Sequence, residues 1–394
     1  MPIGWPSSWR SDDERDGRPV LIAALSGRAL AAAARRAGVL TIVLDRFADT
    51  DTVQLAASCT ALPHGRRGFS RRPFLAALRV LRGQVQGLVY GAGFEHDPAL
   101  LAEAADIVPI LGNRPEAVAA IKDPFRFAAL LARLDLPHPP VRRDPPSGPG
   151  WLRKAVGGSG GAHVTRAIPG RPTRPGWYYQ KAAAGRSVSA AFVADGRTAR
   201  IVGFTEQWTA ETAAAPFRYG GCAGPLRLPP RLTSAVAAAC NAVTGAARLV
   251  GLNSLDMLID GSDFHVLEVN PRPGATLDVL DGIHGWSLWQ LHRDALDGRL
   301  PKPRRGAAPA RAAQIVYAPR RCVIPDHFAW PAWTADRGRP GTVIGRGEPI
   351  CTVATGGSSA TLVRQRAGGL AAQLLARLSA LTTGVPHAEE AAVA

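Results

Sequence analysis

The sequence predicts an α/β protein that begins with a parallel sheet covered by helices, and two observations support this fold class. Residues 19–45 (PVLIAALSGRALAAAARRAGVLTIVLD) predict an apolar strand, a glycine turn, an Ala-rich helix and a second strand that ends at Asp45. Two more buried strands are expected at residues 87–90 and 107–111, and each runs directly into glycine. Strands that alternate with helices favour a parallel sheet with helices on both faces.

The length of 394 residues fits two or three domains, and 46% hydrophobic with 20% charged residues is typical of a globular protein. The Pro- and Gly-rich residues 142–150 are expected to form a loop between modules. Residues 299–311, rich in proline and basic residues, predict a linker. We expect boundaries near residues 115 and 300, a last module at 301–383 that ends in an Ala/Leu-rich helix, and a loose tail at 384–394.

The net charge is strongly positive. Lysine and arginine number 47 against 31 aspartate and glutamate residues, so the formal charge is +16 and favours anions such as nucleotides, acidic substrates or nucleic acid. Aromatic residues are not interleaved with the short basic clusters, which are Arg66, Arg67, Arg71 and Arg72, and Lys302, Arg304 and Arg305. We therefore favour a solvated face over a nucleic-acid surface.

The five cysteines lie far apart and form no C-x-x-C pair, which argues against a disulfide framework and a structural zinc site. Residues 1–18 are polar and Pro-rich, without an apolar signal core. No stretch is long and apolar enough to predict a membrane span. The predicted location is the cytoplasm, with no membrane partner.

The most informative stretch is residues 249–276 (LVGLNSLDMLIDGSDFHVLEVNPRPGAT), which predict two strands joined by a Gly-Ser turn. If the turn centres near Ser262, Asp256 and Glu268 face one another across the hairpin. Asn270 then lies on the same face as Glu268, because side chains alternate along a strand. Three such oxygen ligands suit Mg²⁺ bound to a nucleotide. The alternative is a surface hairpin whose polar face meets water.

Two features favour the metal site. The alternate positions are apolar, so the carboxylates are expected to be buried, and buried carboxylates need a partner. The rigid turn that follows, residues 270–273 (NPRP), brings the cation Arg272 next to the ligands.

Residues 151–164 (WLRKAVGGSGGAHV) predict a short strand that carries Lys154 and then a glycine-rich loop. The loop consists of Gly157, Gly158, Ser159, Gly160 and Gly161. Its backbone N–H groups are suited to wrap phosphate oxygens, and Lys154 adds a point charge. The spacing is not that of a P-loop. A flexible connector is the alternative interpretation.

Two weaker candidates complete the set. The strand that ends at Gln180 leads into a junction where groups at Gln180, Lys181 and Ala183 are suited to bond a purine edge, although an edge turn is the favoured interpretation from composition. Lys122 precedes a helix entered through Asp123 and Pro124. A lysine in that position is ordinarily solvated, so only its neighbours make it a candidate.

Taken in order, these features resemble the ATP-grasp enzymes: Lys122, Lys154 with its glycine loop, Gln180 to Ser187, and Asp256 with Glu268 and Asn270. The order and the E-x-N-P-R run are specific together. The resemblance covers about residues 115–300. It implies an α/β (α+β) protein with a Rossmann-like sheet domain at 1–115, an ATP-grasp domain with two α+β lobes at 116–300 and a small β-rich module at 301–383.

The resemblance also implies roles for the candidate residues. Lys122 and Lys154 would contact ATP phosphates under the loop Gly157 to Gly161. Mg²⁺, which Mn²⁺ can replace, would bind Asp256, Glu268 and Asn270. Arg272 would face the transferred phosphoryl group or the substrate carboxylate and, with Lys154, take part in catalysis. Gln180, Lys181 and Ala183 would contact the nucleotide.

The chain departs from the family's pattern at two positions. Ala155 follows the strand lysine where family members often have proline, and Lys181 stands where an acidic hinge residue is common. The second departure bears on the adenine and ribose contacts.

The implied reaction joins a carboxylate to an amine. The γ-phosphoryl group of ATP passes to the carboxylate, and the amine then attacks the acyl phosphate, so positioning and charge neutralisation replace a protein nucleophile. The alternatives are activation of formate or bicarbonate in nucleotide synthesis, and a regulatory protein that binds ATP without turnover. The expected partners are small molecules, and a homodimer is compatible with the resemblance.

Residues beyond the metal turn offer an acceptor pocket or a helix core. His284, Trp286, Trp289 and His292 lie on or near a predicted helix at 288–296, and the helix core is the favoured interpretation. The runs NPRPGATLDVLD and IGRGEPICTV resemble, more faintly, ligases that build the amino-acid part of methanofuran-like cofactors. That resemblance implies a glutamate-like carboxylate and a tyramine-like amine.

Overall fold

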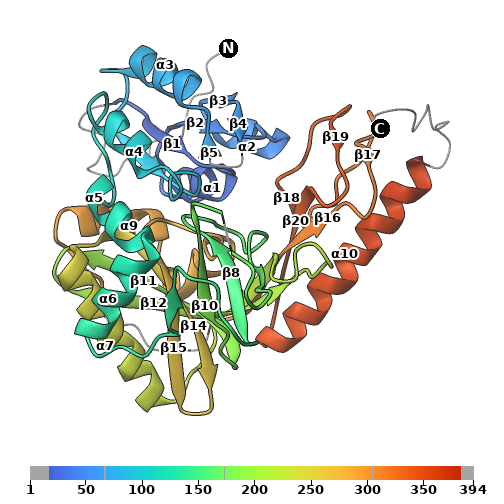
Figure 1. Ribbon diagram of the computed structural model, residues 1–394. Coiled ribbons are helices and arrows are strands. Elements are labelled where there is room, and N and C mark those ends of the chain that lie inside the picture. Colours follow the sequence, from blue (N-terminus) through green and yellow to red (C-terminus); the bar gives the residue numbers. More distant parts are fainter. Residues whose placement is uncertain (1–16, 66–67, 173, 303–305, 307, 383–394) are drawn as a thin grey trace.

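The computed structural model describes residues 17–65, 68–172, 174–302, 306 and 308–382. The tail expected at 384–394 lies outside these residues, as do Arg66, Arg67, Arg304 and Arg305 of the predicted basic clusters. Figure 1 shows an N-terminal part, a central part and a C-terminal part that ends in the long helix α10 (Ala360–Thr382).

The N-terminal part is a parallel sheet with strand order β3-β2-β1-β6. Its strands are β1 (Val20–Ala23), β2 (Thr41–Asp45), β3 (Ser58–Ala61) and β6 (Leu88–Tyr90). The packing helices are α1 (Arg28–Arg36), α2 (Thr50–Leu55), α3 (Arg71–Leu81) and α4 (Pro98–Ala105). All four residues of β1 are buried, as a continuous apolar run in a parallel strand requires. The predicted α/β class is confirmed.

One predicted strand is not formed. Residues 107–111 contribute only an isolated parallel bridge between Ile110 and Leu88, flanked by bonds from Leu88 N to Pro109 O and from Leu111 N to Leu88 O. Pro109 has no N–H to donate, and this interrupts the ladder that a regular strand would need. A small hairpin, β4 (His64–Gly65) with β5 (Gly68–Phe69), completes this part.

Two helices lead into the central part, α5 (Pro115–Lys122) and α6 (Pro124–Arg133). The Asp123 carboxylate accepts hydrogen bonds from the N–H groups of Phe125 and Arg126 and so caps α6, with Pro124 in its first turn. The predicted helix entry at Asp123 is confirmed. Because the cap ends one helix and begins the next, Lys122 is fixed at the corner between them.

The central part contains a small antiparallel sheet of order β7-β10-β8-β9. Its strands are β7 (Val141–Arg142), β8 (Trp151–Ala155), β9 (Thr165–Arg166) and β10 (Trp177–Lys181). Lys154 on β8 pairs with Tyr178 on β10, and Leu152 pairs with Gln180, so these side chains share one face of the sheet.

A large antiparallel sheet runs through the central and C-terminal parts, in the order β15-β14-β11-β12-β13-β16-β20-β18. Its strands are β11 (Arg186–Asp195), β12 (Ala199–Thr209), β13 (Tyr219–Gly224), β14 (Val250–Asp260), β15 (Asp263–Asn270), β16 (Ala310–Tyr317), β18 (Thr334–Ala335) and β20 (Pro349–Gly357). The C-terminal strands therefore extend the same sheet. A short pair, β17 (Cys322–Val323) with β19 (Val343–Ile344), lies beside it.

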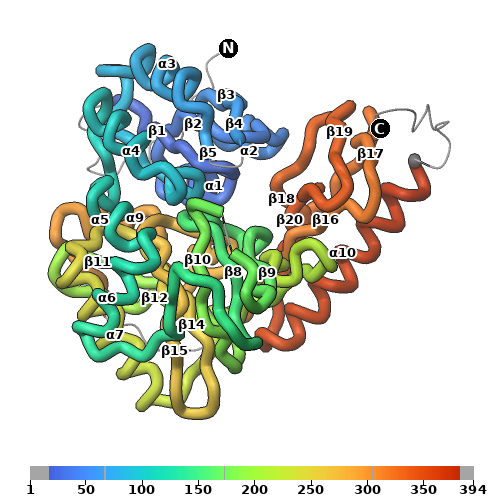
Figure 2. The backbone as a smooth tube through the Cα atoms, in the orientation of Figure 1, coloured from blue at the N-terminus to red at the C-terminus, as the bar shows by residue number. Residues whose placement is uncertain are grey.

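Helices cover both faces of this sheet. The helix α7 (Pro230–Ala247) packs in one apolar core with β11, β12 and β14. The elements α8 (Leu277–Leu280), η3 (Ile283–Gly285) and α9 (Leu288–Leu296) share a second core with β1 and α1 of the N-terminal part. The helix α10 packs against β13, β16 and β20, and Figure 2 shows it beside β16 and β20. The N-terminal and central parts thus share one hydrophobic core, which fixes their relative position.

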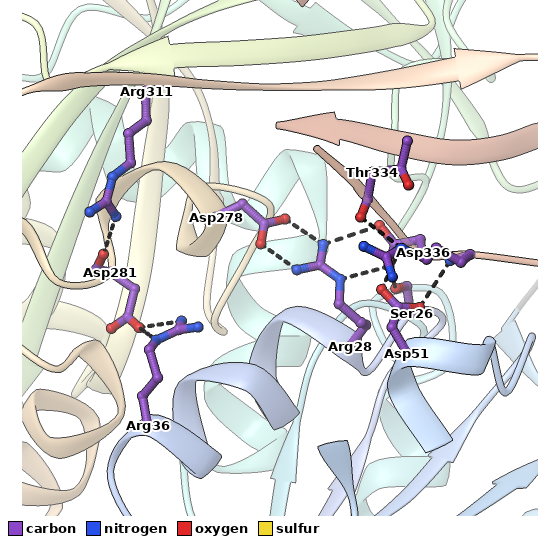
Figure 3. A network of polar contacts seen from close by, with 10 residues as sticks. Ser26, Arg28, Arg36, Asp51, Asp278, Asp281, Arg311, Thr334 and Asp336 are labelled. Atoms are coloured by element: carbon purple, nitrogen blue, oxygen red, sulfur yellow. Dashed lines mark hydrogen bonds and ion pairs between the residues drawn. The ribbon is translucent and has the colours of Figure 1, made fainter. Parts of the chain in front are cut away.

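A buried arginine joins all three parts (Figure 3). Arg28, at the start of α1, donates to both carboxylate oxygens of Asp278 at 2.5 and 2.6 Å and to both of Asp336 at 3.1 Å. Asp278 belongs to α8, and Asp336 follows β18. Backbone N–H groups of Asp336 and Arg337 donate to Asp51 on α2 at 2.9 Å. We call Arg28, Asp51, Asp278 and Asp336 the junction cluster.

Candidate active site

The hairpin β14–β15 brings the predicted acidic residues together. Asp256 pairs with Glu268 across the hairpin, and Ser254 pairs with Asn270. Gly261, with φ of +60°, provides the left-handed turn conformation. Asn270 Nδ2 donates to Asp256 Oδ2 at 2.9 Å, and Ser189 Oγ on β11 donates to Asp256 Oδ1 at 2.5 Å. The predicted pairing of Asp256 with Glu268 is confirmed, but the turn centres between Gly261 and Ser262, and a bulge at Leu267 brings Glu268 opposite Asp256. Ser189 joins the group through the neighbouring strand.

Lys122 points into the same group from the end of α5. Its ammonium donates to Asn270 Oδ1 at 2.8 Å and to Glu268 Oε2 at 3.3 Å, and its side chain is only 6% exposed. The Glu268 side chain is 38% exposed, so one face of this carboxylate meets solvent. Lys154 Nζ donates to Gln180 Oε1 at 3.1 Å. Two lysines therefore converge with the hairpin, although they lie more than a hundred residues earlier in the chain.

The charges in this group perturb one another. Burial raises the pKa of the Asp256 carboxyl, and the adjacent Glu268 carboxylate acts in the same direction. Burial also opposes ionisation of Glu268, but Lys122 and Lys154 outweigh it and lower the pKa of this carboxyl. Burial lowers the pKa of Lys154 against the attraction of Glu268. A further cation beside Asp256 would favour its ionised form.

A pocket adjoins these residues between the small sheet and the hairpin. Its lining comprises Ile121, Lys122, Pro124, Phe127, Ala128, Leu131, His138, Pro139, Val141, Lys154, Ala155, Gly157, Gly158, His163, Tyr178, Gln180, Val266, Leu267 and Glu268. The lining combines a large apolar set with a few polar groups, among them Lys122, Lys154, Gln180 and Glu268. Such a division suits a flat apolar ring attached to an anionic chain.

The glycine-rich loop contributes only its first part to this lining. Gly157 and Gly158 line the pocket, whereas Ser159, Gly160 and Gly161 do not. A Cβ on Gly158 would lie 2.5 Å from the His163 ring, and one on Gly161 would lie 1.9 Å from Phe217 O. The loop is therefore packed closely on the protein at these two positions, which only glycine permits.

Two predicted nucleotide contacts lie outside the pocket. Neither Lys181 nor Ala183 belongs to the lining, in contrast to Gln180. The Lys181 N–H donates to Pro140 O at 2.9 Å, and its exposed ammonium lies 5.4 Å from the centre of the Trp151 ring. The N–H of Ala182 is likewise engaged with Gly150 O.

Arg272 is held by a residue that the sequence analysis missed. Arg272 Nε donates to Glu95 Oε1 at 2.5 Å, and these side chains are 10% and 4% exposed. Glu95 Oε2 accepts from the N–H groups of Gly93 and Phe94 at 2.7 and 3.1 Å. These contacts lower the pKa of Glu95 although burial opposes its ionisation, so the carboxylate is charged. The only sequence signal was a carboxylate after the glycines that follow the strand β6.

His163 is a second residue that was missed. Its ring lines the pocket, and its Nδ1 atom is buried without a partner among the described residues. Burial lowers its pKa, although Glu268 acts in the opposite direction. A histidine two residues beyond the glycine run was the available signal.

The helix α9, which follows the turn at residues 270–273, packs in the core, as the favoured interpretation of the sequence predicted. Trp289 and His292 are 1% and 2% exposed. The His292 ring accepts from Leu252 N at 2.9 Å through Nδ1, so Nε2 carries the proton and donates to Leu111 O at 2.9 Å. Both ring nitrogens are engaged, and these two residues are excluded from an acceptor pocket.

The donor set near Glu268 suits a hard cation. Asp256, Glu268 and Asn270 offer two carboxylates and one amide oxygen, the oxygen chemistry that Mg²⁺ prefers when phosphates supply the other ligands. Within the described ranges, no group of three or more His, Cys, Asp and Glu side chains is arranged to hold a metal.

The architecture is that of the ATP-grasp fold, and comparisons with known proteins agree. Residues 122–276 match the family model of the ATP-grasp domain. This stretch of the chain is an ATP-grasp domain. No curated protein matches the sequence. Among the helices in the part of the chain that the structure describes, we find none with the length and apolar character of a membrane span.

Solved structures show the same fold. Pyruvate carboxylase T882A from Rhizobium etli superposes with a TM-score of 0.70 and 15% identity over 92% of this chain, which spans only 39% of that protein. The ADP complex of an N5-carboxyaminoimidazole ribonucleotide synthetase gives 0.65 and 14%, with 92% and 98% of the two chains covered. The L-amino acid ligase from Bacillus licheniformis gives 0.66 and 14%, with 90% and 96% covered.

Proposed function

We propose that this protein is an ATP-dependent ligase that activates a carboxylate as an acyl phosphate and couples it to an amine. The observation that carries the proposal is the convergence of Lys122 with Glu268 and Asn270, at 3.3 and 2.8 Å, beside a pocket with a mixed apolar and polar lining. The ATP-grasp domain and the amino acid ligase among its structural neighbours support it.

In this proposal each group near the pocket has one task. Lys122 and Lys154 neutralise the phosphates, and the backbone of Gly157 to Gly161 covers them. Bound Mg²⁺, or Mn²⁺ in its place, would neutralise charge on the phosphate oxygens from Asp256, Glu268 and Asn270. The apolar lining takes the adenine ring, with Gln180 at its polar edge.

The proposed reaction needs positioned charges rather than a protein nucleophile. A carboxylate oxygen of the substrate attacks the γ-phosphorus of ATP, and the bond to the β-γ bridging oxygen breaks, which releases ADP. The amine then attacks the acyl carbon, phosphate leaves and the amine loses a proton. Arg272, held by Glu95, is the cation that would receive the carboxylate or the transferred phosphoryl group.

A screen for ADP release tests the proposal. The purified protein, Mg²⁺ and ATP are incubated with amino acids in combination with amines, and the products are analysed by mass spectrometry. Release of ADP that requires both a carboxylate and an amine, with formation of the amide, is expected. The narrower proposal is a glutamate-like carboxylate with a tyramine-like amine, so this pair belongs in the first set. ATP binding without turnover in any mixture would contradict the ligase proposal.

A second candidate is the activation of bicarbonate or formate. Its support is that structural neighbours include a biotin carboxylase domain solved with MgADP and bicarbonate, and the N5-carboxyaminoimidazole ribonucleotide synthetase. ADP release that depends on bicarbonate or formate and yields no amide from an added amino acid would favour this candidate. A third reading, a regulatory protein that binds ATP, predicts no ADP release from any mixture.

A further inference from the structure

A segment of the N-terminal part contacts both the glycine-rich loop and Arg272. Residues 93–96 follow β6, and we call them the 93–96 segment. Glu95 binds Arg272 through its side chain at 2.5 Å. The Nδ1 atom of the next residue, His96, lies 2.8 Å from Val156 O at the start of the glycine loop. Two consecutive residues therefore touch two different elements of the candidate site.

The His96 contact has a defined direction. A carbonyl oxygen only accepts, so His96 Nδ1 must carry the proton and donate it to Val156 O. His96 is half-buried, and Val156 directly follows β8. The bond therefore joins the N-terminal part to the small sheet, and it breaks if the two separate.

The backbone contacts reinforce this bond. Gly157 has φ of +68°, and a Cβ there would lie 2.4 Å from Glu95 O and 2.5 Å from His96 Cα. The first glycine of the loop is thus seated directly on the 93–96 segment. Gly157 also lines the pocket beside Lys154. Gly157 therefore both contacts the 93–96 segment and forms part of the pocket lining.

The far end of the loop is held separately. Tyr219 N donates to Gly160 O at 2.8 Å, and the close approach of Gly161 to Phe217 O fixes the next residue. Loss of the His96 bond is therefore expected to release the start of the loop while its end stays attached.

Resting on the proposed function, we propose that His96 is a positioning residue whose bond to Val156 O holds the start of the glycine loop over the bound nucleotide. Because Glu95 is its neighbour, the 93–96 segment couples the position of Arg272 to that of the loop. A substrate that engages Arg272 then favours the covered state, in which ATP is shielded from water.

Hydrogen exchange on the full-length protein, with and without Mg²⁺ and a non-hydrolysable ATP analogue, tests the positioning role. In wild type the analogue should protect the peptide over Val156 to Gly161 and the peptide around Glu268. In His96→Ala only the first protection should fall, by about three- to tenfold, the size expected for one hydrogen bond. His64→Ala, a half-buried histidine in the same part of the chain, is the matched control.

Conservative variants keep the test sharp if His96→Ala folds poorly. His96→Asn places an amide N–H near the position of Nδ1 and should restore protection, whereas His96→Gln places it elsewhere and should not. In kinetics, His96→Ala should raise KM for ATP more than it lowers kcat for ADP release. Full loop protection in His96→Ala or His96→Gln would overturn the positioning role.

Glu95→Gln tests the coupling. This change weakens the grip on Arg272 without altering a side chain that touches the loop, so partial loss of loop protection is expected, and unchanged protection would overturn the coupling. The proposed function is judged separately. Absence of analogue-dependent protection around Lys122 and Glu268 in wild type would overturn nucleotide binding, and with it this inference. Wild-type protection that is lost over the loop in His96→Ala and partly lost in Glu95→Gln supports both.

Discussion

The junction cluster and the group around Glu268 both bring buried charges together from distant parts of the chain, but they differ in how completely those charges are paired. Arg28 donates two hydrogen bonds to each of two carboxylates, so both pairs are bidentate. Around Glu268, one carboxylate is 38% exposed, Lys154 donates to the amide oxygen of Gln180 rather than to a carboxylate among the described residues, and a pocket lies alongside. Complete pairing suits a cluster that holds the parts together, whereas incomplete pairing is consistent with the ligand site that we propose around Glu268.

The largest effect is expected from a substitution in the group around Glu268. Glu268→Gln removes the carboxylate that lies against Lys122 and that we propose as a metal ligand, and ADP release should fall by about 100-fold or more. Because Lys122 and Lys154 lower the pKa of Glu268 in the folded protein, the change also removes some stability, so turnover is compared well below the thermal midpoint of both proteins. Asp263→Asn, an exposed carboxylate on the same strand, is the matched control. Wild-type turnover in Glu268→Gln would remove this residue from the site.

The next largest effect is expected from a substitution that disrupts the junction cluster, and it concerns stability rather than turnover. Arg28→Ala leaves Asp278 and Asp336 without their cation, each 19% exposed, and should lower the free energy of unfolding by about 3 kcal/mol. Denaturant unfolding measures this change. Arg299→Ala, which breaks only exposed pairs with Asp294 and Asp297, should have no measurable effect. An equal effect of the two variants would show that the junction cluster contributes no more than a surface pair.

A smaller effect sharpens the comparison within the site. Ser189→Ala deletes the donor 2.5 Å from Asp256 Oδ1, so the proposed metal ligand loses its orientation. The Mg²⁺ concentration for half-maximal ADP release should rise by about tenfold, with recovery at saturating Mg²⁺. Ser234→Ala on the exposed face of α7 is the control. A lower maximal rate with an unchanged Mg²⁺ requirement would contradict an orienting role.

The last effect depends on pH and concerns Asp49, which lies next to the junction cluster. Burial, followed by the charges of Asp336, Asp45 and Asp51, raises the pKa of Asp49 to about 8. An unfolded aspartate has a pKa of about 4, so between these values only the folded state keeps its proton. Stability contributed by this proton is present at low pH and is lost as the pH rises toward 8.

Asp49→Asn carries no such proton, so its thermal midpoint should exceed that of wild type by more at pH 8 than at pH 5. Melting curves of both proteins at the two pH values test this difference. An identical difference at both pH values would mean that Asp49 titrates normally in the folded protein.

The sequence predicted local features of the site well. Asp256, Glu268 and Asn270 lie on one hairpin, and alternation along two strands with a Gly-Ser turn predicted that they would meet, although the bulge at Leu267 that completes the pairing was not predicted. The helix cap at Asp123 predicted where Lys122 lies, whereas its choice as a candidate rested on the resemblance to the ATP-grasp enzymes. These features depend on neighbours along the chain, which a pattern can show.

Long-range partners were not predictable in this way. Glu95 lies 177 residues before Arg272, and Arg28 lies 308 residues before Asp336, and nothing in the local pattern of either acid marks its partner. The strand predicted at residues 107–111 was wrong, because the prediction relied on apolar content and did not take account of the missing N–H of Pro109. The pairing of β13 with β16 could not be predicted from the sequence either, because the composition of a strand does not identify the strand beside it.

The pairing of β13 with β16 limits where the chain can be truncated to produce a recombinant fragment. Gly221 to Gly224 on β13 bond to residues 311–314 on β16, across the end of the segment that matches the ATP-grasp family. A recombinant fragment that stops near residue 300 would leave this strand as a bare sheet edge. Unpaired edges recruit strands from other molecules, so such a fragment should self-associate rather than behave as an independent catalytic unit.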